Sequence, residues 1–467
     1  MTAVTETQDA YFRNFASLER RRAQKDPAWL RKIRKEAIDR FAELGFPNSN
    51  NEEWKYTSVA ALARIPFRPT ADYLPPSTAR QPKEPLRPYL EDCIPLHFFN
   101  GQFVEEMTPA DSLPVGVKIT SLAKAFSAGL ELLEKYFAKY AGYQKQPFVA
   151  LNTAFVEDGA LIEIAKDTIL NKPIYLRFMA GPTTAPIVYH PRNLILLGQG
   201  SQATIVEQYL SANQDNENLY FTNSVTEVVL GENARVEHVK EQDESRSAFH
   251  IATLQFQQDR ASSVNTHTLA FGSSLAREDV IAVLDGQGAE CSLNGLYVTT
   301  GSQHVDNHTT IDHAQPHCSS RELYKGILDG KSTGVFNGKI VVRKDAQKTD
   351  SKQSNKNLLL AEDCVINTKP QLEIFADDVK CTHGATIGQI DAESIFYLRS
   401  RGIGLEQART MLTQAFANDV IGKIKSEPLR ARLEKTLVEK LARKAAPEIS
   451  RQEPGRERFR MSTLHER

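Results

Sequence analysis

Between about residues 148 and 390, the chain consists of many short β-branched and apolar runs with no long helical pattern between them. Examples are residues 193–197, 234–239 and 338–343, which are rich in Val, Ile and Leu. Runs of this composition predict strands. An alternation of strands and helices would show helical patterns between the runs, so a doubly wound sheet does not fit.

Turn-forming residues recur in this region at irregular intervals near roughly fifteen residues. They are Gly288, Gly301, Gly330, Asp345, Asp363 and Asp377. A β-sandwich and a parallel β-solenoid both remain compatible with this pattern. The same succession of short strand-forming runs continues over roughly 240 residues, which favours stacked solenoid coils. We therefore predict a mainly β protein with a right-handed parallel β-helix core over residues 148–390.

Helical patterns lie before this core. Asp26 and Pro27 suit an N-cap and a first helical position, and apolar residues follow at helical spacing from Leu30 to Leu44. A second helical patch covers about residues 122–140. The proline-dense stretch at 66–88 predicts an extended connector. Residues 1–147 are thus expected to form an N-terminal helical region with a proline-rich connector.

Helical patterns also follow the core. Apolar stripes at helical spacing predict a hairpin of two helices within a C-terminal helical domain over residues 391–467. The first stripe contains Leu405, Ala408, Leu412, Phe416, Val420 and Ile424, and the second contains Leu429, Leu433, Leu437 and Leu441. A charged tail follows from about residue 448. One face of each helix is expected to pack on the β core, and a docking surface for a partner would be an additional role.

The charge and the cysteine pattern exclude several classes of protein. A net charge of −1 argues against nucleic acid as the main partner. The five cysteines are scattered without a Cys-x-x-Cys pair, which favours a reducing compartment. Residues 1–19 lack the apolar segment of a signal peptide, and no run is long enough to span a bilayer. We therefore expect a soluble, cytoplasmic protein that binds no membrane.

A thiol and an imidazole, Cys381 and His383, stand two residues apart among strand-forming residues. At this spacing both side chains leave the same face of a strand. Such a pair can bind iron, zinc or an iron-sulfur cluster, but a closed site needs more ligands, from distant segments or from another chain. Taken alone, the pair fits buried core residues better than ligands.

Two other motifs have simpler explanations than the function they suggest. Gly330, Lys331 and Ser332 match the end of a phosphate-binding loop, but Lys325 occupies the position of its first glycine, and a strand pattern follows the loop. A turn is therefore expected there, without nucleotide binding. The residues His304, His308, His313, His317 and Cys318 form the densest cluster of potential ligands. Their spacing does not place them on one strand face, so satisfied or exposed histidines are favoured, and a shared metal site remains an alternative.

A carbohydrate-active solenoid enzyme is a further alternative. Enzymes of that kind use clusters of acidic and basic side chains, a role that Asp377, Asp378 and Lys380 could fill. Charged turn residues explain these three positions more simply. A purely structural solenoid, with its Cys and His in the core, is the third possibility.

Several segments together resemble the SufD branch of the SufB/SufD family of Suf iron-sulfur cluster assembly proteins. They are residues 304–309, 316–326, 334–338, 346–350, 355–360, 367–373, 377–388 and 397–403, and residues 51–57 resemble the amino-terminal signature of the family. The resemblance implies a β-helix between helical terminal domains. It also implies a non-catalytic scaffold subunit that pairs with a paralogous SufB-like subunit and a SufC-like ABC-type ATPase.

The resemblance also implies where the function lies. His383 falls on the functional histidine of the family, near the interface where a transient iron-sulfur cluster forms, and the neighbouring Cys381 carries over less securely. ATP is expected to bind the partner and not this chain. We expect Leu405, Ala408, Leu412, Phe416 and Val420 to contact the ATPase. The sequence leaves open whether reduced flavin binds the assembly and whether a homodimer precedes the heterodimer.

Overall fold

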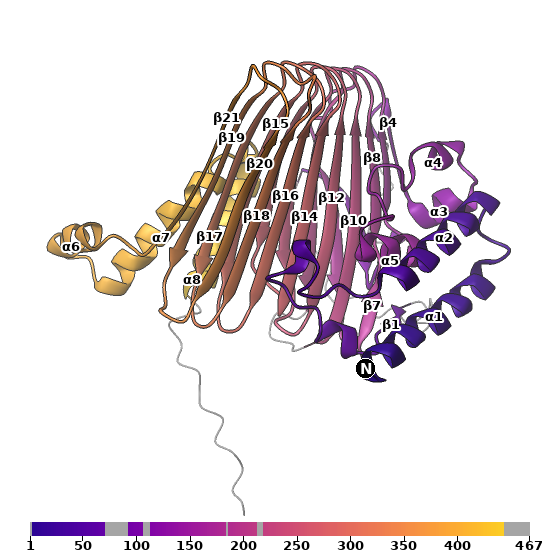
Figure 1. The fold of residues 1–467 in the computed structure, drawn as a ribbon, viewed down its shortest axis with the longest axis horizontal. Coiled ribbons are helices and arrows are strands. Elements are labelled where there is room, and N and C mark those ends of the chain that lie inside the picture. The colour runs from indigo at the N-terminus through magenta and orange to yellow at the C-terminus, as the bar shows by residue number, and fades with distance from the viewer. Residues whose placement is uncertain (1, 71–91, 106–112, 184, 213–217, 443–467) are drawn as a thin grey trace, which may run out of the picture.

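Two long sheets of mostly parallel strands face each other and wind about a common axis as a β-helix (Figure 1). The computed structural model describes residues 2–70, 92–105, 113–183, 185–212 and 218–442. In the eleven-stranded sheet the strands are β1 (Arg68–Pro69), β4 (Val117–Ser121), β5 (Ala160–Ile164), β7 (Ile187–Tyr189), β8 (Arg192–Leu197), β10 (Tyr220–Leu230), β12 (Phe249–Gln258), β14 (Leu275–Leu284), β16 (His304–His313), β18 (Thr333–Val342) and β20 (Val365–Ile374). The ten-stranded sheet contains β2 (Ile94–Phe99), β3 (Gln102–Phe103), β6 (Ile174–Ala180), β9 (Gln202–Ser211), β11 (Arg235–Asp243), β13 (Ser263–Ala270), β15 (Glu290–Thr299), β17 (Ser319–Leu328), β19 (Asp350–Leu359) and β21 (Lys380–Gly388).

The strands alternate between the two sheets along the chain, so each coil contributes one strand to each sheet. Thr309 of β16 pairs with Gly338 of β18, which pairs with Pro370 of β20, and one coil therefore takes roughly thirty residues. The predicted turn residues lie where the chain passes from one sheet to the other, which explains their spacing of about half a coil. The predicted parallel β-helix is confirmed.

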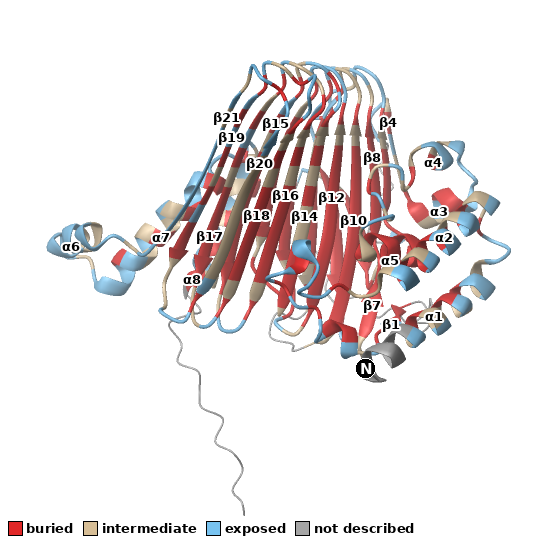
Figure 2. Ribbon diagram, in the orientation of Figure 1, coloured by how far each residue is buried: buried red, intermediate tan, exposed pale blue. Residues whose placement is uncertain are grey.

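The core lies between the sheets. In each strand alternate side chains point inward, because successive residues of a strand face opposite sides. On β18, Phe336, Ile340 and Val342 join the main apolar cluster with Val280 of β14 and Leu293 of β15. Figure 2 shows buried strands through most of the solenoid and a gradual change to intermediate and exposed residues at β20 and β21.

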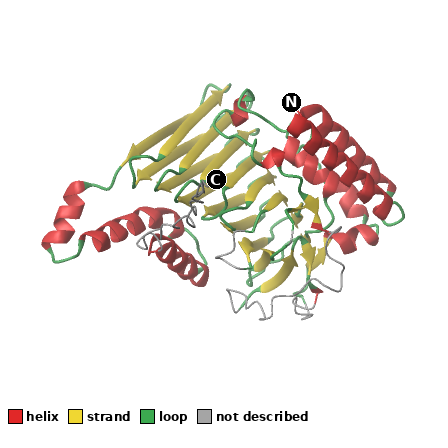
Figure 3. Ribbon diagram, turned by 90° about the horizontal axis from the view of Figure 1, so that it is seen from below, coloured by secondary structure: helices red, strands yellow, loops and turns green. Residues whose placement is uncertain are grey.

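Helices of the N-terminal region cover the outer face of the eleven-stranded sheet (Figure 3). They are α1 (Thr2–Arg22), α2 (Ala28–Leu44), α3 (Leu122–Ser127), α4 (Glu131–Tyr136) and α5 (Pro147–Phe155), with 3₁₀ turns η1 (Glu52–Trp54) and η2 (Leu62–Arg64). Phe41 of α2 and Phe148 of α5 pack in one cluster with Phe221 and Phe249 of the sheet. The helix predicted after Pro27 is confirmed. The proline-dense stretch falls mostly outside the described residues.

The C-terminal region contains α6 (Ala392–Ser400), α7 (Leu405–Ile421) and α8 (Glu427–Ala442). The last two helices pack on the ten-stranded sheet, whereas α6 has no buried residue. Leu433 and Leu437 of α8 pack with Val420 of α7 against Leu269 and Leu296 of the sheet. The predicted hairpin is therefore present, while the charged tail lies outside the described residues.

The predicted domain boundaries fall at the start of α5 and between β21 and α6. Strands before residue 148 also join the sheets, because β2 pairs in parallel with β6 and β4 pairs with β5. No helix in the described ranges combines the length and the apolar character needed to cross a membrane.

Candidate functional site

The last coil of the solenoid, formed by β20 and β21, is open to solvent. Each of these two strands is the outermost strand of its sheet, so one edge of each carries unpaired backbone groups. Apolar side chains that would lie in the core of a longer solenoid are exposed here, with Ile374 at 40% and Ile387 at 51%. Val365 and Phe375 are also exposed, at 50% and 63%. An open apolar end of this kind is typical of an interaction surface.

Cys381 and His383 lie on β21 at this open end. Cys381 is half-buried and packs against the main core cluster. Burial raises the pKa of its thiol, so the protonated form dominates near neutral pH. His383, two residues along the same face, is exposed. Core packing, which the spacing alone favoured, therefore describes Cys381 in part and is wrong for His383.

The two side chains do not complete a metal site by themselves. Among the described residues, no group of three or more Cys, His, Asp or Glu side chains lies close enough to hold a metal ion. Zinc and iron-sulfur sites in proteins usually have four protein ligands. The described residues of the open end can thus offer one or two ligands, fewer than a closed site needs.

The histidines of the predicted cluster lie apart and have other partners. His304 bonds the Thr57 hydroxyl at 2.8 Å, and His313 bonds the Ser320 hydroxyl inside the solenoid at 2.9 Å. His317 is exposed in a turn. His304 and His313 are therefore hydrogen-bonded and His317 is exposed, as the favoured interpretation expected.

The amino-terminal signature at residues 51–57 clamps onto the outer face of the eleven-stranded sheet. Trp54 stacks on Arg277 of β14, whose guanidinium lies 3.7 Å from the ring centre. Arg277 forms an ion pair with Asp306 of β16 at 2.8 Å and donates to the Glu53 carbonyl at 2.6 Å. Thr57 donates to Asp306 at 2.6 Å. Hydrogen bonds and charge thus attach residues 51–57 to β14 and β16, which lie more than two hundred residues later in the sequence.

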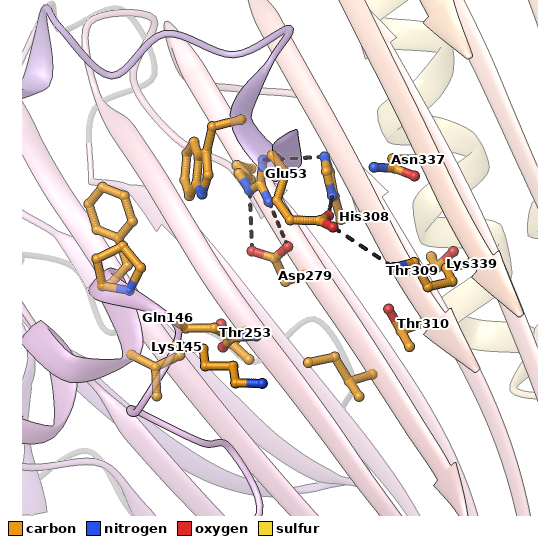
Figure 4. A pocket seen from close by; sticks show the side chains of 16 residues that line it. Glu53, Lys145, Gln146, Thr253, Asp279, His308, Thr309, Thr310, Asn337 and Lys339 are labelled. Carbon is orange, nitrogen blue, oxygen red and sulfur yellow. Dashed lines mark hydrogen bonds and ion pairs between the residues drawn. The ribbon is translucent and has the colours of Figure 1, made fainter. Parts of the chain in front are cut away.

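A cavity of about 180 Å³ lies beside this clamp, between η1, the start of α5 and the outer faces of β14, β16 and β18 (Figure 4). His308 points into it and contacts Asp306 at 3.0 Å and Glu53 at 3.4 Å. Lys339 lies 3.9 Å from Glu53 on the far side. Because acidic and basic groups pair with one another here, the network fixes the signature segment to the sheet.

The charge on His308 makes this clamp sensitive to pH. Burial lowers the pKa of His308. The charge of the Asp306 carboxylate and the hydrogen bonds that the ring donates to Asp306 and Glu53 outweigh burial and Arg277, and they raise this pKa to about 9. A histidine whose folded pKa exceeds the unfolded value stabilises the fold fully below pH ~6.5 and loses that effect as pH rises towards 9. We expect the wild-type chain to lose up to about 3 kcal/mol between these pH values.

The measurement is urea unfolding at pH 6.5 and pH 9 for the wild-type chain and for His308→Gln. The variant keeps a neutral donor and should show a smaller difference between the two pH values. Equal pH dependence in both chains would contradict the role of His308.

The loop around Gly330 is a turn between β17 and β18. Gly330 has φ +68°, and strand β18 follows at Thr333, where a phosphate-binding loop would need a helix. The expected turn is confirmed. Asp378, one of the three residues that could have served a carbohydrate-active site, forms an ion pair with Lys348 of a neighbouring turn.

The predicted ATPase-contacting residues of α7 differ in exposure. Leu405 is 42% exposed, and Leu412 and Phe416 are partly exposed. Ala408 and Val420 are buried, and Val420 packs against the solenoid. The exposed apolar surface continues instead onto α6, where Phe396 and Tyr397 are 74% and 57% exposed. Figure 1 shows α6 projecting from the body beyond the open end of the solenoid.

Comparisons with known proteins agree with this architecture. The core-domain model of the SufBD proteins, described as SUF system FeS cluster assembly, matches residues 180–416, and the model of the SufBD N-terminal region matches residues 5–176. This chain belongs to the SufBD family. The resemblance found in the sequence is confirmed, and the family is one of iron-sulfur cluster assembly proteins.

Relatives within the SufBD family span nearly the whole chain. An iron-sulfur cluster assembly SufBD family protein of Synechocystis is 34% identical over 407 residues, covering 86% of this chain and 88% of that protein. The iron-sulfur cluster assembly protein SufD of Escherichia coli is 29% identical, covering 84% and 89%. SufD of Bacillus subtilis is 23% identical, covering 87% and 93%. The similarity to SufD proteins thus extends over most of the chain.

Proposed function

We propose that this chain is a non-catalytic scaffold subunit that builds a transient iron-sulfur cluster at a junction with a second, paralogous scaffold subunit. The observation that carries the proposal is the open last coil, which presents an exposed histidine beside a half-buried cysteine at the edge of a sheet. The cluster is the cargo of this site. It needs ligands from both chains, because the described residues of this chain supply too few.

The partner is expected to join through β-strand addition and apolar contact. β21 has free backbone groups along its outer edge, while Pro370 interrupts β20, which lacks one N–H group there. The exposed apolar residues around the two edges, including Ile374 and Ile387, would be buried in the junction. A second copy of this chain could use the same end, so a homodimer competes with the heterodimer.

Incomplete coordination suits assembly and release. A cluster held by one ligand set on each of two chains loses half of its ligands when the junction opens. An ABC-type ATPase that grips both scaffold chains would supply the movement, as a difference in affinity for two states of the complex. On this chain the surface for that grip consists of α6 and the exposed start of α7.

His383→Ala tests the proposal in the chain co-expressed with the paralogous subunit and the ATPase. We expect the cluster content to fall strongly, because an imidazole ligand is lost. The complex and the melting temperature should stay close to wild type, since His383 is exposed and fills no core position.

Iron and sulfide content, the visible absorption of the cluster and thermal unfolding are measured together. Thr382→Ala is the matched control, because Thr382 is exposed on the same strand and faces the opposite way. Normal cluster content in His383→Ala would refute the ligand role. A low content with a collapsed melting temperature would point to a structural role instead.

A further inference from the structure

One row of inward-facing positions on the ten-stranded sheet leads from the core to His383. Leu293, Glu322, Gln353 and His383 pair in register on β15, β17, β19 and β21. Leu293 belongs to the apolar core, whereas Glu322 and Gln353 are polar and only 3% and 2% exposed. Adjacent strands lie about 4.8 Å apart, so Gln353 is the inner neighbour of His383.

The amide of Gln353 is bonded on one side only. Its Nε2 donates to Oε2 of Glu322 at 2.6 Å. Its Oε1 is buried and has no hydrogen-bond partner among the described residues. A buried carbonyl without a donor destabilises a fold, so an unpaired acceptor at this place needs an explanation.

Glu322 decides which end of the amide faces the open coil. Burial raises the pKa of Glu322 to about 7, although the hydrogen bond from Gln353 acts in the opposite direction. Above that pH the side chain is a carboxylate, which accepts hydrogen bonds and donates none. The amide N–H₂ therefore faces Glu322, and the carbonyl oxygen is left for a donor on the other side.

We propose that the Gln353 carbonyl accepts the ring N–H of His383 and so fixes which imidazole nitrogen is free to bind the cluster. A histidine that binds metal through one nitrogen is commonly held by a hydrogen bond from the other, and removal of that bond weakens metal binding about 10–100-fold. Gln353 is a positioning residue that does not touch the cluster. The ligand role rests on the proposed function, but the contact between Gln353 and His383 does not.

The tautomer of His383 tests the contact directly. The full-length chain is labelled with ¹⁵N-histidine, and ring-nitrogen NMR spectra are recorded at pH 8 without partners or cluster. The His383 signal is identified by its absence in His383→Ala. We expect one tautomer to dominate in the wild-type chain and the ratio in Gln353→Met to relax towards that of a free imidazole.

Ser351→Ala is the matched control. Ser351 is buried on the same inward face of β19, two residues from Gln353, and its hydroxyl bonds Ser320 at 2.7 Å. This variant should keep the wild-type tautomer ratio of His383. If His383 in the wild-type chain shows the tautomer ratio of a free imidazole, the inference is wrong. This measurement needs only the wild-type chain, so it tests the contact even if Gln353→Met fails to fold. An unchanged ratio in folded Gln353→Met would overturn it too.

Cluster content separates this inference from the proposed function. In the co-expressed complex, Gln353→Met should lower the cluster content about tenfold or more while the partners are retained. A changed tautomer ratio with normal cluster content would support the contact and refute His383 as a ligand. An unchanged ratio would refute the contact, whatever His383→Ala does to the cluster.

Discussion

Arg192→Met is expected to lower the free energy of unfolding by about 3–5 kcal/mol. Arg192 of β8 is fully buried, and its Nη2 and Nε donate to Oε2 of Glu227 at 2.7 and 3.0 Å. Its Nη1 donates to Asn152 and Thr153 of α5 at 3.1 and 2.9 Å. The carboxylate of Glu227 also accepts three backbone N–H groups of residues 138–141.

The physical reason is a buried charge without a partner. Methionine fills a similar volume but leaves the Glu227 carboxylate in the interior without its cation. The residues of α5 and of the loop after α4 would also lose their connection to the sheet. The double variant Arg192→Met/Glu227→Gln removes the unpaired charge while an amide oxygen can still accept, so it should recover part of the loss.

Urea unfolding of the full-length chain measures the effect. Arg343→Met is the matched control, because Arg343 pairs with Asp312 at 2.6 Å but is 54% exposed. Exposed ion pairs contribute about 0–1 kcal/mol, so this variant should stay close to wild type. Similar losses in Arg192→Met and Arg343→Met would contradict the prediction.

The double variant Phe396→Ser/Tyr397→Ser is expected to weaken capture of the ABC-type ATPase by on the order of 10³-fold. Buried aromatic anchors of an interface are commonly worth about 2 kcal/mol or more each, and 1.4 kcal/mol is a factor of ten in affinity. Both rings are mostly exposed in this chain. Their removal should therefore leave the stability of the scaffold almost unchanged.

Co-purification and the dissociation constant for the ATPase are the measurements, with thermal unfolding in parallel. Val438→Ser on α8 serves as the control, since Val438 is 43% exposed on a helix outside the proposed surface. Wild-type affinity in the double variant would show that the ATPase does not bind through α6. Deletion of the helices is a poorer test, because α7 and α8 pack against the solenoid.

Local patterns in the sequence were sufficient to predict the architecture. β-branched runs and turn residues repeat along the coils, and helical stripes flank them, because the preferences of strands, turns and helices act over a few residues. The family resemblance then directed attention to His383. The predicted ATPase contacts of α7 included residues that are not accessible. An apolar stripe shows that a helix face is apolar, but it does not show whether the same chain already covers that face. Ala408 and Val420 are covered in this way.

Only the tertiary structure decided which of these residues are accessible and which partners they meet. Period-two alternation places Cys381 and His383 on one face, but the missing next coil leaves His383 exposed while Cys381 still touches the core. Arg277 meets Trp54, and Gln353 meets Glu322, because coiling stacks segments that are far apart in sequence. No local pattern encodes such pairs, since each depends on the register of the whole solenoid.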